Sequence, residues 1–198
     1  MMDWIKFSEE VHQNAVEHGW WDEERSFGEI VSLCHSELSE ALEEFRAKRP
    51  MVWLPCTVSS FANTPCEKDG CGDWSDGVCE IDALGKKPEG IAVELADCII
   101  RIMDWFGKEK KDATHFLDRA KTQGVIQTGG TFGEFIAELH SVLTYAYDSD
   151  IGPSFHLALC VVDILEWAEE NGVDMEAILR MKHEYNKGRP YRHGGKAL

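Results

Sequence analysis

Residues 26–41 read Ser26-Phe-Gly-Glu-Ile-Val-Ser-Leu-Cys-His-Ser-Glu-Leu-Ser-Glu-Ala41, and a similar stretch, Thr131-Phe-Gly-Glu-Phe-Ile-Ala-Glu-Leu-His-Ser-Val-Leu-Thr-Tyr-Ala146, occurs later in the chain. A second match relates Leu95-Ala-Asp-Cys-Ile-Ile-Arg-Ile-Met-Asp-Trp105 to Leu157-Ala-Leu-Cys-Val-Val-Asp-Ile-Leu-Glu-Trp167. Apolar residues in all four stretches follow the period of an amphipathic helix. The sequence therefore predicts a unit of two helices that is present twice.

This repeat predicts a single all-α domain: a helical bundle of two tandem helical hairpins that together form a pseudo-dimer. We expect helices at residues 3–18, 26–47, 88–107, 131–147, 153–170 and 174–186, with a short helix and a linker between 108 and 127. The first repeat comprises 1–46 and 88–111, interrupted by a Cys-rich insertion at 47–87. A linker at 112–130, a second repeat at 131–187 and a C-terminal tail at 188–198 complete the chain of 198 residues.

Two acidic pairs stand in the first repeat, Glu37-Leu-Ser-Glu40 and Glu94-Leu-Ala-Asp97. Residues three apart lie about 60° from each other around a helix, so each pair places two carboxylates on one face. The aligned positions of the second repeat hold no acid; they are Val142, Tyr145, His156 and Leu159. Because the acids are lost together, mostly to large apolar or aromatic groups, we expect all four positions to face inward. Four carboxylates in a bundle core repel each other unless cations neutralise them, and oxygen ligands favour Mg²⁺ or Mn²⁺.

The charge of the chain excludes several classes of partner. Its formal net charge is −16 and its pI is near 4.8, so its long-range field repels nucleic acid and anionic membranes. The start of the chain lacks a basic segment leading into an apolar run, and no stretch approaches the roughly 18 apolar residues that span a bilayer. We expect a cytoplasmic protein.

The seven cysteines fall into two groups. Cys34, Cys98 and Cys160 lie in apolar helical patterns, where cysteine usually behaves as a small buried hydrophobe. Cys56, Cys66, Cys71 and Cys79 lie in the insertion and are a candidate set for a structural Zn²⁺. Their spacing lacks tight Cys-x-x-Cys knuckles, so reduced free thiols are the favoured interpretation.

The acidic pairs and the ending Lys182-His-Glu-Tyr-Asn186-Lys-Gly-Arg189-Pro190-Tyr191 together resemble the MazG-like, all-α nucleoside triphosphate pyrophosphohydrolases. The resemblance covers most of the chain except the insertion. It implies magnesium-dependent hydrolysis of a nucleoside triphosphate, expected to be a deoxy or non-canonical one, to the monophosphate and pyrophosphate. By position, Glu37, Glu40, Glu94 and Asp97 match the metal ligands, and Glu37 or Glu40 is expected to orient the attacking water.

The same resemblance implies further site residues and an assembly. Lys182 and Arg189 are candidate phosphate ligands, and Asn186 is a candidate for binding sugar or phosphate. Trp20 and Trp21 are candidates for stacking on the base, although tryptophans after a helix-ending glycine more often cap a core. Dimeric dUTPase-like relatives carry two units in one polypeptide, so we expect a monomeric pseudo-dimer or a homodimer.

Two other functions fit parts of this sequence. A ferritin-like di-iron bundle also gathers carboxylates, but it needs two ExxH motifs, and only Glu9-Glu-Val-His12 fits one. A non-catalytic nucleotide-binding module would keep the fold without turnover. Loss of the acids would indicate such a module, and the first repeat retains all four.

Overall fold

A computed structural model describes residues 2–54, 87–123, 130–150 and 152–192. These ranges contain seven helices and no strand, which confirms the all-α class for this part of the chain. The helices are α1 (Trp4–Glu17), α2 (Phe27–Arg46), α3 (Ile91–Lys108), α4 (Ala113–Gln123), α5 (Phe132–Asp148), α6 (Ser154–Glu170) and α7 (Met175–Lys187). The four cysteines of the insertion, and with them the candidate Zn²⁺ set, lie outside the described residues.

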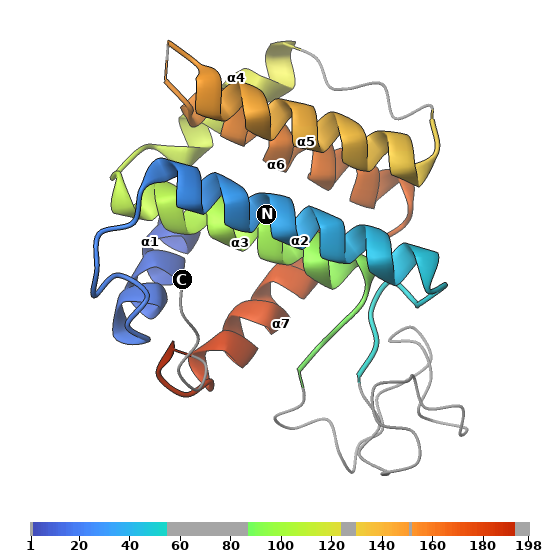
Figure 1. The fold of residues 1–198 in the computed structure, drawn as a ribbon, viewed down its shortest axis with the longest axis horizontal. Coiled ribbons are helices and arrows are strands. Elements are labelled where there is room, and N and C mark those ends of the chain that lie inside the picture. Colours follow the sequence, from blue (N-terminus) through green and yellow to red (C-terminus); the bar gives the residue numbers. More distant parts are fainter. Residues whose placement is uncertain (1, 55–86, 124–129, 151, 193–198) are drawn as a thin grey trace.

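The helices form stacked layers around α3 (Figure 1). Helices α4, α5 and α6 lie together on one side, α2 and α3 form the middle, and α1 and α7 cover the other side of α3. Because α3 packs against α1, α2, α6 and α7, its side chains are buried almost all round, including Leu95, Ile99 and Ile102. A helix that is apolar on nearly every face is stable only at the centre of a bundle.

Most helix ends fall within a residue or two of the sequence-based expectation, because local capping sets them. Ser26 accepts a hydrogen bond from the Glu29 N–H, and the Glu29 carboxylate accepts one from the Ser26 N–H at 2.7 Å. Thr131 and Glu134 form the same capping box in the second repeat. Helix α1 ends before Gly19, whose φ of 75° is a conformation that favours glycine.

Helix α3 begins at Ile91, three residues later than the expected start at residue 88. The segment before α3 is extended: the N–H of Trp53 donates to the carbonyl of Glu89 at 2.8 Å, and the N–H of Glu89 donates back at 3.0 Å. Gly90 then has φ of 121°, and a Cβ there would lie 2.6 Å from the carbonyl oxygen of Met51. The close approach of this second segment delays the helix until Ile91.

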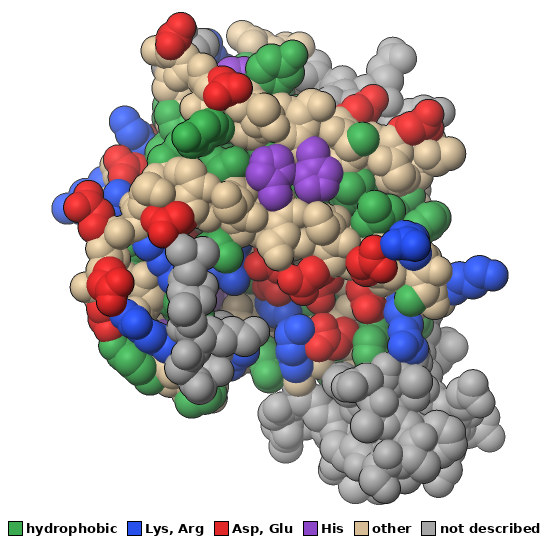
Figure 2. All heavy atoms as spheres, viewed as in Figure 1, with side chains coloured by type: hydrophobic (Ala, Val, Ile, Leu, Met, Phe, Trp, Pro, Cys, Tyr) green, Lys and Arg blue, Asp and Glu red, His purple; other side chains and the backbone are tan. Residues whose placement is uncertain are grey.

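Equivalent residues of the two repeats touch each other where α2 and α5 cross. The Nδ1 atoms of His35 and His140 are 2.6 Å apart, and their rings stack with an interplanar angle of 15°. The start of α2 meets the end of α5 at Phe27 and Tyr147, so the two helices run antiparallel. A pair of neighbouring histidine side chains is visible on this face in Figure 2.

A second pair of equivalent residues meets deeper in the bundle. The thiol of Cys98 on α3 lies beside those of Cys160 on α6 and Cys34 on α2. All three are fully buried and free, which confirms their expected role as small core residues. The neighbouring thiols, with burial as a further cause, raise the pKa of Cys34 and Cys98 well above that of an ordinary thiol.

Helices α4 and α7 pack against helices that their positions in the sequence did not predict. The expected linker at 112–130 includes α4, which packs against α6 through the buried Ala113, Leu117 and Ala120. Helix α7, at the end of the second repeat, returns to pack mainly against α3 of the first repeat. The C-terminal helix therefore brings its side chains to the part of the molecule that carries the acidic pairs.

Candidate functional site

Three of the four predicted acids meet between α2 and α3. Oxygen atoms of Glu37 on α2 and of Glu94 and Asp97 on α3 all lie within 4.8 Å of one another. Glu37 is 7% exposed and Glu94 only 2% exposed, so two of the carboxylates are removed from bulk water. Figure 2 shows acidic side chains gathered close to basic ones on the face of the molecule where α2 lies.

Burial and mutual repulsion change the acid–base properties of this group. Burial, with the neighbouring Asp97 carboxylate, raises the pKa of Glu94 to about 9, although Lys182 and Lys87 act in the opposite direction. Burial also raises the pKa of Glu37, and Asp97 and Glu40 add to that effect while Arg101 opposes it. A carboxyl group with such a raised pKa gains most from a nearby cation.

Glu40 is not part of this group. Its side chain is exposed, and the Ser36 hydroxyl lies 3.4 Å from one of its carboxylate oxygens. Its counterpart in the second repeat, Tyr145, is 65% exposed, so the expectation that all four positions face inward is wrong at this position. The reason is geometric: a residue three positions further along α2 is rotated by about 60° and here lies beyond the contact with α3.

Two cations are already bonded to the acids. Lys182 of α7 is 1% exposed, and its Nζ lies 2.8 Å from Asp97 Oδ2 and 3.4 Å from the carbonyl oxygen of Pro88. Arg101 donates from its Nε to Glu37 Oε1 at 3.1 Å. Lys182 was predicted as a phosphate ligand, and the structure places it instead against a predicted metal ligand.

Sequence reasoning missed Arg101. The residue lies four positions after Asp97 and seven after Glu94 on the same helix, so all three project on one side of α3. That spacing was the available signal. Its counterpart in the second repeat is Asp163, so the charge at this position reverses in the repeat that lacks the acids.

A cleft adjoins the acids and collects four of the predicted site residues. Trp20, Asp97, Asn186 and Arg189 line it together with Arg101. The remaining lining residues are Val11, Asn14, Ala15, Ile100, Asp104 and His183. The cleft therefore lies between α1, α3 and the end of α7, with Asp97 shared between it and the acidic group.

Three buried polar atoms on this cleft make no hydrogen bond within the described ranges. They are Asn14 Oδ1, His183 Nε2 and Asn186 Oδ1. Buried polar groups are nearly always paired with protein, water or ligand. The concentration of such atoms on one cleft identifies it as a place where a polar molecule can bind.

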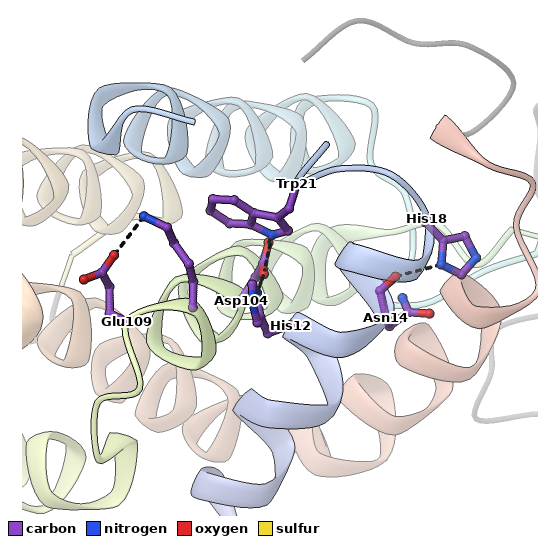
Figure 3. A network of polar contacts seen from close by, with 7 residues as sticks. His12, Asn14, His18, Trp21, Asp104 and Glu109 are labelled. Carbon is purple, nitrogen blue, oxygen red and sulfur yellow. Dashed lines mark hydrogen bonds and ion pairs between the residues drawn. The ribbon is translucent and has the colours of Figure 1, made fainter. Parts of the chain in front are cut away.

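The two predicted tryptophans differ in position. Trp20 lines the cleft, and the guanidinium of Arg25 lies 5.0 Å from the centre of its ring. Trp21 instead donates its indole N–H to Asp104 at 2.9 Å, and His12 Nδ1 lies 2.8 Å from the same carboxylate (Figure 3). Trp21 thus belongs to a structural network, in agreement with the commoner role of tryptophan after a helix end.

The network around Asp104 also bears on the di-iron alternative. His12, the histidine of the single ExxH motif, bonds Asp104 and is not among the three residues whose oxygens converge between α2 and α3. In the part of the chain that the structure describes, the candidate metal group contains carboxylates only. This donor set does not favour the His-containing iron site that the motif suggested.

No family model, curated protein or solved structure matches this chain. None of the helices in the described ranges combines the length and the apolar character needed to cross a membrane.

Proposed function

We propose that the protein is a magnesium-dependent nucleoside triphosphate pyrophosphohydrolase of the MazG-like kind. One observation carries this proposal: three mutually close carboxylates from α2 and α3 adjoin a cleft lined by arginine, asparagine and tryptophan side chains. Carboxylates can hold a hard cation, arginines can hold phosphates, and a tryptophan offers a face for a base. The expected substrate is a deoxy or non-canonical nucleoside triphosphate.

The donor set fits Mg²⁺ or Mn²⁺. All three groups are carboxylates, the ligand type that these ions prefer. Glu37 and Asp97 each have a basic partner, whereas the buried Glu94 has a pKa near 9 and no bonded cation among the described residues. A divalent ion held by Glu37, Glu94 and Asp97 would offset the burial and the repulsion from Asp97 that raise this pKa.

Each residue of the site would have a different role in the reaction. When bound, the divalent ion would lower the pKa of a water molecule and neutralise charge on the phosphates. Lys182 holds Asp97 in place, and Arg101 does the same for Glu37. Glu40, which is exposed on α2 three residues after Glu37, would orient the attacking water and accept its proton. The bond between the α- and β-phosphates breaks, and its electrons leave with one phosphate product while the water oxygen joins the other.

We further propose that the second repeat is an inactive copy and that the chain is an internal pseudo-dimer. Two pairs of equivalent residues, His35 with His140 and Cys98 with Cys160, contact each other. Self-contact of equivalent positions is what a two-fold axis produces. Such an axis would relate α2 to α5 and α3 to α6. One chain would then hold one working site, either as a monomer or within a homodimer, and would act on the nucleotides of the cytoplasm.

The proposal is tested by measuring pyrophosphate release from a panel of canonical, deoxy and damaged nucleoside triphosphates. We expect release that requires Mg²⁺ or Mn²⁺, stops with a chelator and falls below detection in Asp97→Asn. Arg180→Met is a matched control, because among the described residues Arg180 is paired with Glu176 on the exposed face of α7. Nucleotide binding without turnover would favour the non-catalytic module, and bound iron in the purified protein would favour the di-iron bundle.

A further inference from the structure

Arg101 occupies a position that joins the acidic group to the cleft. Its Nε bonds Glu37, and its side chain also lines the cleft next to Asp97. Arginine carries five N–H donors in a planar fork, and this bond uses only one of them. Within the described residues, no hydrogen bond from Nη1 or Nη2 of Arg101 is present. The free edge of the guanidinium is thus available to a molecule in the cleft.

Arg189 supplies a second guanidinium to the same cleft from a different element. It follows the end of α7, and its guanidinium lies 5.8 Å from the centre of the Tyr185 ring, without an ion pair to any described residue. Burial lowers the pKa of Arg189, Tyr185 and Asp97 act in the opposite direction, and the neighbouring Arg101 adds to the lowering. A chain with a net charge of −16 keeps two cations together on one cleft, which indicates an anionic ligand.

Each acid that lines the cleft already has a bonded partner of its own, although Asp97 also interacts electrostatically with both arginines. Asp97 is bonded to Lys182 at 2.8 Å, and Asp104 is bonded to His12 and to the indole of Trp21 (Figure 3). Both carboxylates are therefore compensated by other side chains. The groups left with unused hydrogen-bonding capacity are the two guanidinium groups and the unpaired polar atoms of Asn14, His183 and Asn186.

The comparison of the two repeats gives an independent reason to connect Arg101 with the site. Where the second repeat has lost Glu37 and Asp97, to Val142 and Leu159, it has also replaced Arg101 by Asp163. Asp163 is fully buried. The arginine is thus present in the repeat that carries the acids and absent from the repeat that lacks them.

We propose that Arg101 is a phosphate-binding residue that uses its Nε to hold Glu37 and its free Nη edge, together with Arg189, to bind the polyphosphate chain of the ligand. This deepens the proposed function and rests on it for the identity of the substrate. Two guanidinium groups beside a cation site suit a di- or triphosphate chain better than a monophosphate, so the expected ligands are compounds with a polyphosphate chain.

The test uses inorganic tripolyphosphate as the probe, titrated calorimetrically into the whole protein with and without Mg²⁺. We expect Arg101→Met and Arg189→Met each to weaken binding by about tenfold or more, the effect of losing one charge-assisted contact. Arg101→Lys keeps the charge without the fork and should recover only part of the affinity. Arg180→Met should bind as the wild type does. Circular dichroism of each variant verifies that the helices remain.

Tripolyphosphate binding and nucleotide hydrolysis are measured separately, so phosphate binding by Arg101 can be tested whether or not the protein hydrolyses a nucleotide. Tripolyphosphate binding that depends on Arg101 would support the phosphate site even if no nucleotide in the panel is hydrolysed. Wild-type affinity in Arg101→Met, or no binding by the wild type, would overturn it even if pyrophosphate release is observed. Where turnover is present, we expect Arg101→Met to raise KM for the nucleotide and to reduce the salt dependence of binding, which a purely structural role would not do.

Discussion

Lys182 of α7 lies with its Nζ 2.8 Å from Asp97 Oδ2 of α3, and the lysine side chain is almost completely buried. This ion pair connects the C-terminal helix to the helix that carries two of the three converging acids. It is one of the contacts that hold α7 against the first repeat, together with the buried apolar side chains of α7. The pair is therefore both a tertiary contact and a part of the candidate site.

Replacing Lys182 by methionine is expected to destabilise the fold. Removing one partner of a buried ion pair leaves an uncompensated charge, which costs about 3 kcal/mol of unfolding free energy. Denaturant unfolding of Lys182→Met measures this loss. Arg180→Met removes an exposed pair whose arginine lies only two residues from Lys182 on the same helix, and it should change stability little. Equal stability of the two variants would show that the Lys182–Asp97 pair is not structurally important.

Glu40 is expected to affect turnover without affecting the cation. Because it is exposed and outside the group of three, Glu40→Gln should leave Mn²⁺ affinity near that of the wild type. Loss of a residue that orients water and accepts its proton should lower kcat by at least about 100-fold. Pyrophosphate release and Mn²⁺ titration of the same variant separate the two effects. Loss of Mn²⁺ binding in Glu40→Gln would instead show that Glu40 is a ligand of the cation.

The His35–His140 pair predicts a loss of stability at acidic pH. Burial lowers the pKa of both residues, and for His35 the neighbouring His140 adds to the effect. The unfolded chain therefore takes up protons near pH 6.5 while the folded chain resists them, so stability falls as the pH drops below that value. The Nδ1–Nδ1 hydrogen bond also requires one unprotonated nitrogen.

This pH effect is measured by the melting temperature at pH 7.5 and at pH 5.5. The melting temperature of the wild type should fall further between pH 7.5 and pH 5.5 than that of a His35→Gln, His140→Gln double variant. A residual loss is expected in the variant, because burial, followed by Lys187, also lowers the pKa of His183. An identical loss in both proteins would mean that the pair does not titrate as a linked unit.

Much of the fold could be predicted from the sequence because it is set by local signals. Ser26 and Thr131 start their helices through capping boxes, and Gly19 and Gly172 end others with positive φ. The start of α3 could not be predicted in this way. It depends on Trp53 pairing with Glu89, a contact between segments that are distant in the chain.

The sequence was enough to predict most of the residues of the candidate site. It was not enough to predict how they are arranged in space. Helical spacing identified Glu94 and Asp97, whereas the exposure of Glu40 depends on where α3 stops covering α2. The packing of α7 against α3 decides that Lys182 meets Asp97 while Asn186 and Arg189 reach the cleft. Arg101 was missed because a lone arginine on a helix face is usually solvated.

Glu37, Glu94 and Asp97 together are expected to bind a divalent cation, and Mn²⁺ titration followed by the paramagnetic resonance of the free ion measures this binding. We expect saturable binding by the wild type and its loss in Glu94→Gln, a substitution of nearly equal size that removes the charge of the most buried acid. Undiminished binding in Glu94→Gln, or no binding by the wild type, would contradict this expectation.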